Sequence, residues 1–117
     1  MIWISKSQVN EEMVVTLAQK INELQEDEKL YWYLCSSGGE THIGLEIVDI
    51  VNRNKEKVEL IASEYIHSTA FLIFFKSQCE RNIIPFTTGI MHCCTTAYDV
   101  KYGAKIAIMK KVEKRTS

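Results

Sequence analysis

The sequence predicts an α/β domain, in which a mostly parallel β-sheet alternates with helices. Two observations support this prediction. Apolar residues recur at helical spacing in several segments, and short apolar runs of strand length lie between those segments. The 117 residues contain no repeat and no linker-like stretch, and this length suits one hydrophobic core. We therefore expect a single domain over residues 1–117.

The first strand and the first helix are expected near the start of the sequence. Residues 2–5 are a short apolar run that fits an edge strand. Asn10 is a residue type that caps helices, and Glu11 and Glu12 follow it, where the helix dipole favours negative charge. The apolar side chains that come next recur at helical spacing: Met13, Val14, Leu17, Ala18, Ile21 and Leu24. They predict one buried helix face.

A strand, a turn, a second helix and a third strand are expected next. Residues 30–35 are aromatic-rich and almost wholly apolar, which predicts a strand covered on both faces. Gly38 and Gly39 end this strand in a turn. Residues 57–62 predict the third strand. The helix between them has these residues on its inward face: Ile43, Ile47, Ile50 and Val51.

The second half of the chain contains four more expected elements. Residues 68–79 predict a buried helix, although an apolar run of this kind also fits a strand. Residues 82–85 and 89–92 predict short strands or extended segments. A last helix is expected from about residue 98, with these residues facing inward: Val100, Ala104, Ala107 and Ile108.

Charge and hydropathy exclude several functions. Fourteen Lys and Arg oppose fifteen Asp and Glu, so the chain has no overall basic field to hold nucleic acid or an anionic membrane. The start lacks the pattern of a signal peptide, and the longest uncharged apolar run, residues 70–75, is too short to span a bilayer. We expect a cytoplasmic protein with neither a nucleic-acid nor a membrane partner.

The cysteines show no metal-binding or disulfide pattern. Cys35, Cys79, Cys93 and Cys94 form no CxxC pair, and reduced thiols are expected in the cytoplasm. His92 precedes two of them, but neighbouring strand residues point to opposite faces and no second ligand pair has suitable spacing. We expect neither a metal nor another cofactor.

Three places could support chemistry, and each has an ordinary structural alternative. Gly38 and Gly39 follow a strand, where bare N–H groups could bind a phosphate or an oxyanion, or where the pair could form a simple tight turn. Ser68 opens an expected helix, as a nucleophile would, although serine at such a point is more commonly an N-cap. His92 ends an expected strand, where it could be a general base or a histidine without a catalytic role.

Taken in order, these segments resemble the Clp protease proteolytic subunit family, which are serine peptidases of the ClpP/crotonase fold. The matching segments are Ser36-Ser37-Gly38-Gly39, Gly44-Leu45, Ser68-Thr69-Ala70-Phe71-Leu72 and Ile90-Met91-His92. The resemblance covers roughly residues 30–92, with a short deletion between the serine and the histidine. It implies a ClpP/crotonase-like fold that is truncated at its C-terminus.

The resemblance also implies the parts of a catalytic site. Ser68 would be the nucleophile and His92 its general base, and the backbone N–H groups of Gly39 and Thr69 would form the oxyanion hole. These roles suit the chemistry, because a serine hydroxyl needs a base and the tetrahedral intermediate needs preorganised donors. The aspartate of the family lies farther downstream than this chain extends, and Asp99 is the candidate to orient His92.

Several residues depart from the family pattern. Ser37 replaces a proline of the glycine turn, Glu64 replaces a glycine, and Ile66-His67 replace two small residues before the nucleophile. A second register matches Ala70-Phe71 to the Ala-Phe of the family. That register places His67 at the nucleophile position and implies an inactive enzyme.

Two functions follow from the sequence. The first is a divergent ClpP-like serine peptidase that cleaves peptide bonds through the Ser68 nucleophile and the His92 base, with a peptide or protein as its substrate. The alternative is a catalytically inactive homologue that acts as a binding or assembly module. Acyl-CoA chemistry on the same fold is a weaker third reading, since no residue points to coenzyme A. The resemblance also implies a homo-oligomer, because family members form rings.

Overall fold

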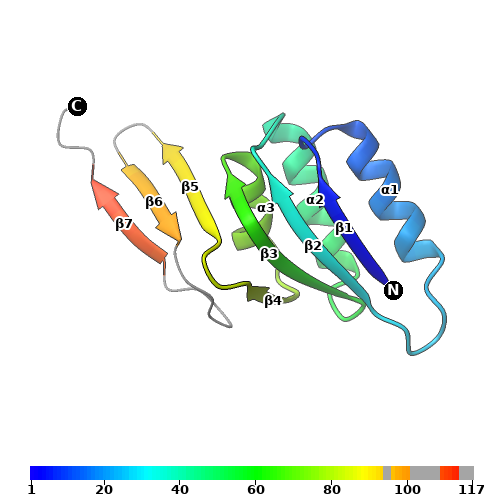
Figure 1. Ribbon diagram of the computed structural model, residues 1–117. Helices are drawn as coiled ribbons and strands as arrows, with labels where there is room; N and C mark the ends of the chain where they lie inside the picture. The colour runs from blue at the N-terminus through cyan, green and yellow to red at the C-terminus, as the bar shows by residue number, and fades with distance from the viewer. Residues whose placement is uncertain (94–95, 101–108, 114–117) are drawn as a thin grey trace.

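The computed structural model describes residues 1–93, 96–100 and 109–113, with side chains as far as Met91. Strands and helices alternate over most of this range (Figure 1). The elements are β1 (Ile2–Lys6), α1 (Glu11–Asn22), β2 (Leu30–Ser36), α2 (Thr41–Arg53), β3 (Val58–His67), α3 (Thr69–Lys76), β4 (Glu80–Ile83), β5 (Thr88–Cys93), β6 (Thr96–Val100) and β7 (Met109–Glu113). The expected α/β class is confirmed.

One sheet contains the described strands in the order β1-β2-β3-β5-β6-β7, with β4 beside β3. β1, β2 and β3 run parallel, and β3 also pairs in parallel with both β4 and β5. β6 and β7 extend the sheet through antiparallel pairs. The sheet is therefore mostly parallel, as the sequence predicts.

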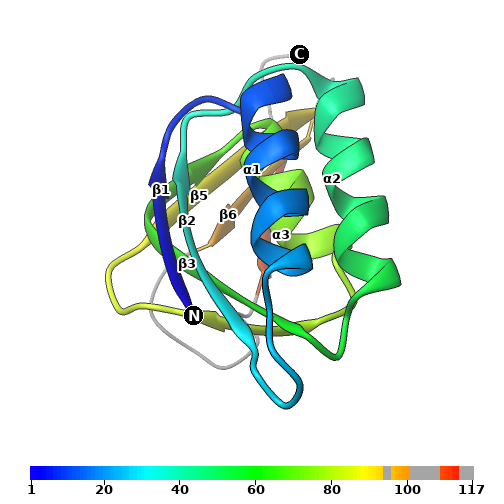
Figure 2. The same cartoon turned by 90° about the vertical axis from the view of Figure 1, so that its right-hand side faces the viewer.

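The three helices lie on one face of the sheet (Figure 2). α1 and α2 connect parallel neighbours that step in the same direction across the sheet, and right-handed crossovers place such helices on the same side. The core lies between these layers and includes large, fully buried side chains: Leu17, Trp32, Ile47, Leu60, Phe71 and Phe74. None of the helices in the described part of the chain is long and apolar enough to cross a membrane.

The prediction that residues 30–35 are covered on both faces is wrong for the first half of β2. Trp32 is fully buried on the helical side, whereas Tyr31 is 37% exposed on the other face. On the neighbouring strand, Ile2 and Ile4 are 65% and 71% exposed. The physical reason is the handedness of the crossovers, which puts both connecting helices on one side of β1–β3.

Local sequence signals correctly predict α1. Asn10 occupies its N-cap position, and the Asn10 Oδ1 accepts a hydrogen bond from the Met13 N–H at 3.1 Å. Met13 and Leu17 are buried on the face that the apolar spacing predicts. The capping chemistry and the apolar spacing therefore agree with the observed helix.

β3 and α3 differ from their predicted bounds. β3 continues past residue 62 to His67, because its second half pairs with β5. α3 ends at Lys76 rather than at residue 79. At that end the Arg81 guanidinium donates hydrogen bonds to the carbonyl oxygens of Phe74 and Phe75, which satisfies acceptors that a helix end leaves unpaired.

The predicted last helix is wrong where the structure describes its residues, because residues 98–100 lie in β6 and β7 begins at Met109. β6 pairs antiparallel with β5, and β7 pairs antiparallel with β6. Thr96, Tyr98 and Val100 are β-branched or aromatic residues, which favour a strand. The other positions of the predicted helix face lie outside the described residues: Ala104, Ala107 and Ile108.

Candidate active site

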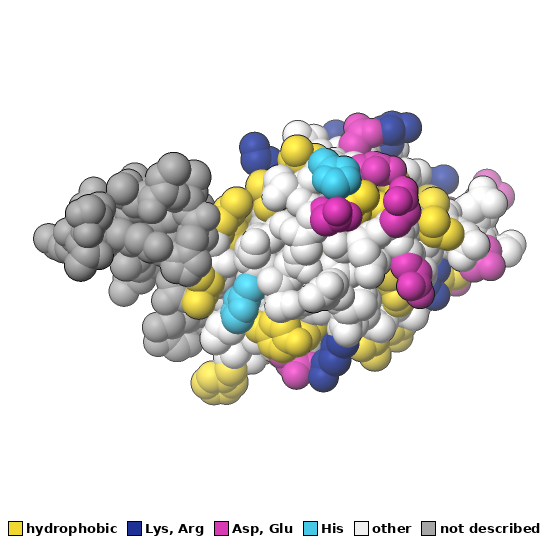
Figure 3. Space-filling view, turned by 90° about the horizontal axis from the view of Figure 1, so that it is seen from above, with side chains coloured by type: hydrophobic (Ala, Val, Ile, Leu, Met, Phe, Trp, Pro, Cys, Tyr) yellow, Lys and Arg dark blue, Asp and Glu magenta, His cyan; other side chains and the backbone are white. Residues whose placement is uncertain are grey.

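The candidate site lies at the carboxyl ends of the parallel strands. Two connections meet at this edge, namely residues 37–40 after β2 and Ser68 after β3. Figure 3 looks down onto this edge and shows acidic side chains gathered on its helical side. The sequence places its candidate nucleophile and its glycine pair in these two connections, so the fold brings them to one place.

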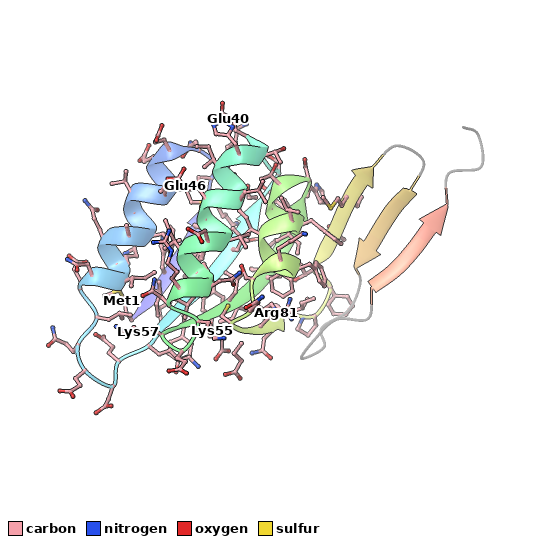
Figure 4. The ribbon with its side chains drawn as sticks, turned by 180° about the vertical axis from the view of Figure 1, so that it is seen from behind. Met1, Glu40, Glu46, Lys55, Lys57 and Arg81 are labelled. Carbon is pink, nitrogen blue, oxygen red and sulfur yellow. The ribbon has the colours of Figure 1, made fainter. Side chains whose placement is uncertain are left out.

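Acidic side chains lie close to the glycine loop. Glu40 follows the loop at the end of the sheet that holds the candidate site, whereas Lys57 and Arg81 lie at the opposite end (Figure 4). Glu11 and Glu12 lie in the first turn of α1.

A bulge in β3 directs the chain toward the site. Up to Ala62, β2 and β3 pair regularly, and then three residues of β3 oppose Cys35 alone. Glu64 lies in this bulge with a left-handed φ of 62°, at a position where the family pattern has glycine, the residue that adopts such a φ without strain. The bulge turns β3 from its pairing with β4 to its pairing with β5. Ser68 therefore emerges beside β5.

Ser68 has a strained backbone conformation between β3 and α3. Its φ is 57° and its ψ is −121°, a combination that is rare for a residue with a Cβ atom. Its N–H donates a hydrogen bond to the carbonyl oxygen of Ile90 at 2.8 Å, and the residue is exposed. Ser68 occupies the N-cap position of α3, but its side chain makes no capping hydrogen bond to this fully described helix. The capping alternative for this serine is therefore not realised.

Gly38 packs directly against Ser68. Its φ is 114°, and a Cβ atom on Gly38 would lie 2.9 Å from the Ser68 Cβ and 3.3 Å from the Thr69 N. Glycine is therefore the residue that fits this turn without displacing its neighbours. The Gly38 N–H donates a hydrogen bond to the Ser36 Oγ at 3.1 Å. This hydroxyl fixes the turn although Ser37 replaces the proline of the family.

Gly39 is held on one side by the connection that precedes α1. The Val9 N–H donates a hydrogen bond to the Gly38 carbonyl oxygen at 2.9 Å, and the Glu40 N–H donates one to the Val9 carbonyl oxygen at 3.3 Å. In such a parallel bridge, the N–H and C=O of the middle residue point away from the partner. On that other side the Gly39 carbonyl accepts a hydrogen bond from the Thr69 Oγ1 at 2.9 Å. The Gly39 carbonyl therefore faces the start of α3.

Thr69 is the first residue of α3 and is only 3% exposed. Its N–H belongs to the first turn, where backbone N–H groups have no partner within the helix. Its Cγ2 fills the space beside Gly44, where a Cβ atom would clash with it. The structure thus brings Gly39 and Thr69, the two residues expected to supply oxyanion donors, together beside the exposed Ser68. Two such donors beside a hydroxyl can stabilise a developing oxyanion.

Three contacts that shape this site were not foreseen from the sequence. They are the bridge from Val9 to Gly39, the hydroxyl of Ser36 and the hydroxyl of Thr69. The Thr69 contact joins residues 30 positions apart. No local sequence pattern reports a contact at that separation. A serine directly before the glycine turn was the one available signal, because serine side chains commonly bind nearby backbone groups.

The backbone of β5 brings His92 to the same edge of the sheet. His67 pairs with Ile90, two positions before His92. β6 runs antiparallel beside β5, where Asp99 pairs with Ile90 and Ala97 pairs with His92. Asp99 therefore lies two positions along β6 from the residue opposite His92. The side chains of His92 and Asp99 lie outside the described part of the structure, so their contacts stay a prediction.

Glu64, a negative charge close to the candidate oxyanion site, has a cationic partner. The Lys6 Nζ lies 2.6 Å from the Glu64 carboxylate, and hydrogen bonding to this carboxylate raises the pKa of Lys6. Both side chains are more than half exposed. Hydrogen bonding to Cys35 raises the pKa of the neighbouring Tyr65. The Lys6 ammonium group offsets the negative charge of Glu64 next to the site.

Ile66 and His67 differ in their effect on the site. Ile66 is fully buried in the core, so its bulk does not reach the surface. The His67 ring lies 5.4 Å from the Tyr65 ring, and its Nε2 lies 3.5 Å from the Thr88 Oγ1. The strained conformation is found at Ser68 and not at His67, which favours the register that matches Ser68 to the nucleophile.

Among the described residues, no group of three or more His, Cys, Asp or Glu side chains is placed to bind a metal ion. Cys35 and Cys79 are buried free thiols, and burial raises the pKa of Cys79. The side chain of Cys93 and the whole of Cys94 lie outside the described residues, so the expectation that His92 and these cysteines bind no metal stays a prediction.

The chain is similar in sequence and in fold to Clp proteases. The Clp protease family model matches residues 2–113. The ClpP protease catalytic domain from Plasmodium falciparum has a TM-score of 0.67 and 23% identity, over 78% of this chain and 54% of that one. ClpP1 from Listeria monocytogenes has a TM-score of 0.66 and 17% identity, over 78% of this chain and 55% of that one.

A mutant of the 1510-N membrane-bound stomatin-specific protease has a TM-score of 0.64 and 17% identity, over 76% of this chain and 45% of that one. No curated protein matches the chain. The chain thus spans about half of the length of the solved structures it resembles. Because the family model matches nearly all of its residues, the chain belongs to the Clp protease family.

Proposed function

We propose that this Clp protease family member is a serine peptidase. The Ser68 Oγ attacks the carbonyl carbon of a peptide bond while the His92 imidazole takes its proton. The N–H groups of Gly39 and Thr69 bind the oxyanion of the tetrahedral intermediate, and the Asp99 carboxylate orients His92. The imidazolium then gives its proton to the leaving amine, and water hydrolyses the acyl ester on Ser68 with His92 again as the base.

One observation supports this proposal most strongly, namely the conformation of Ser68. An ordinary N-cap serine has an extended backbone and uses its hydroxyl to cap the helix. Ser68 instead has a φ of 57°, and it is an exposed residue whose side chain does not cap α3. Strained residues of this kind persist where the surrounding structure holds them, and they cluster at functional sites.

A fluorophosphonate probe tests the proposal directly. We expect the folded chain to be labelled, with the added mass on the peptide that contains Ser68. Ser68→Ala should remove the label. Ser7→Ala changes an exposed serine in the β1–α1 connection and should keep the full rate of labelling, which controls for unspecific reaction with surface serines.

The replacement of small residues by Glu64 and His67 favours a second candidate function, that of an inactive binding or assembly module. The same experiment separates the two candidates. If the wild-type chain unfolds cooperatively in urea, and is therefore folded, but takes up no probe, the peptidase proposal fails and the module is favoured.

We also propose that the chain forms a homo-oligomer. The uncovered face of the sheet supports this, because Ile2, Ile4 and Tyr31 are exposed side by side on β1 and β2. Burying apolar surface contributes about 25 cal/mol per Å² to association. Sedimentation velocity should show species larger than a monomer that increase with concentration, and Ile4→Glu should shift them toward the monomer. A wild-type chain that stays monomeric at every concentration contradicts the proposal.

A further inference from the structure

The Thr69 side chain connects the two parts of the candidate oxyanion hole. Its hydroxyl donates a hydrogen bond to the Gly39 carbonyl oxygen at 2.9 Å. The N–H groups of these same two residues are the proposed oxyanion donors. We infer that the Thr69 hydroxyl is a positioning group that fixes the distance between the two donors, a role that rests on the proposed peptidase function.

The Thr69 side chain is held in one orientation. The residue is 3% exposed, and its Cγ2 lies in the space that the missing side chain of Gly44 leaves free. With the methyl group packed there, the hydroxyl is directed at Gly39. Because the methyl group and the hydroxyl of Thr69 both have fixed contacts, the side chain loses no more conformational entropy when the oxyanion forms. Gly39 is therefore already held in place before the reaction begins.

The other hydrogen bonds of the glycine loop lead away from α3. Val9 ties the loop to the connection before α1, and Ser36 ties it to the end of β2. Gly38 touches Ser68 through van der Waals contact. Among the hydrogen bonds of the described residues, the bond from Thr69 is the one that joins this loop to the helix that follows the nucleophile. With Ser37 in place of a proline, this bond takes over part of the restraint that a proline ring would supply.

Removing the hydroxyl should therefore displace one donor relative to the other. Removing a whole oxyanion donor lowers the rate by about 10²–10³-fold, and a misplacement of about 1 Å can cost about 10²-fold. For Thr69→Val we expect a loss of about 10- to 100-fold in the second-order rate of fluorophosphonate labelling, since both donors remain but are less well placed.

Three variants separate this role from a loss of stability. Thr69→Val keeps the packing on Gly44 and loses the hydroxyl, so it should be labelled slowly. Thr69→Ser keeps the hydroxyl and loses the methyl group, so it should be less stable in urea and yet be labelled at a rate close to that of the wild type. Thr87→Val is the matched control, because Thr87 is a buried threonine whose hydroxyl binds the carbonyl oxygens of Ala62 and Ile84 away from the site.

The outcomes are distinguishable. The inference is supported if Thr69→Val is labelled slowly while Thr69→Ser and Thr87→Val are labelled at nearly the wild-type rate. The pH at which labelling of Thr69→Val reaches half of its maximal rate should equal that of the wild type. Labelling of Thr69→Val at the wild-type rate overturns the role of Thr69 and leaves the peptidase proposal intact. A slow Thr87→Val variant would show that the rate follows stability, which also overturns the inference. A folded wild-type chain that takes up no probe overturns the peptidase proposal, and the role of Thr69 with it.

Discussion

Replacing His92 with alanine is expected to lower the rate of peptide hydrolysis by about 10⁶-fold, which is the scale of loss when one member of a serine–histidine pair is removed. Without the imidazole, the Ser68 hydroxyl must lose its proton to water as it attacks the peptide carbonyl. The backbone register supports this role, because the Ser68 N–H binds the carbonyl oxygen of Ile90, two residues before His92 on β5. The measurement is the rate of cleavage of a short fluorogenic peptide, together with the rate of probe labelling.

A second histidine provides the control for this prediction. His42 is exposed on α2 and should be replaceable by alanine with no change in rate. Asp99→Asn should lower the rate by about 10⁴-fold if Asp99 orients His92, as in other serine proteases. If His92→Ala cleaves and is labelled as fast as the wild type, His92 is not the base and the proposed mechanism is wrong.

The sequence predicts the fold best where a signal is local. Asn10 caps α1 and the apolar spacing marks its buried face, because capping and helical periodicity depend on residues a few positions apart. The second half of β3 could not be predicted in this way. Residues 63–67 are of mixed polarity, and they form a strand because the bulge at Glu64 turns them toward β5. Their partner is more than 20 positions away in the chain, as in the pair of Tyr65 with Thr88.

The start of the predicted last helix, at residues 98–100, is wrong for the same physical reason. The apolar spacing after residue 98 fits a helix, but pairing with the edge of β5 outweighs that local preference in β6. Pairing across a sheet satisfies the N–H and C=O groups of β5 that would otherwise remain unpaired at its edge. A pattern that is read within one segment contains no information about such an edge.

The sequence indicates which segments meet at the candidate site but not how they are arranged. The fold brings the glycine pair and Ser68 to one edge of the sheet, whereas the contacts of the His92 side chain stay a prediction. The way in which the glycine loop is held depends on Val9, and on hydroxyl groups of Ser36 and Thr69. The family pattern of the loop names none of these contacts, so they cannot be read from that pattern alone.

Gly39→Ala is expected to slow probe labelling by at least about 100-fold, because it should displace one of the two oxyanion donors. A Cβ atom at this position would clash with the carbonyl oxygen of Val9. Because Val9 is buried and the clashing atom belongs to its backbone, a side-chain rotation cannot relieve the clash. The bridge between the Val9 and Gly39 segments must therefore open, and Gly39 must move away from Val9 together with its N–H group. Overpacking of this kind also lowers the free energy of unfolding by about 1–3 kcal/mol.

The loss of stability and the loss of the donor can be separated with the Thr87→Val variant. That variant also loses stability, because the Thr87 hydroxyl no longer donates hydrogen bonds to the carbonyl oxygens of Ala62 and Ile84, but it leaves the glycine loop untouched. Urea unfolding gives the stability of each variant, and the probe gives its rate. Gly39→Ala should fall far below Thr87→Val in rate at similar stability, because the geometry of the oxyanion hole, and not the stability of the domain, sets the rate of attack by Ser68. If the two variants are labelled at the same rate, the Gly39 N–H is not an oxyanion donor, and the glycine loop is a structural turn.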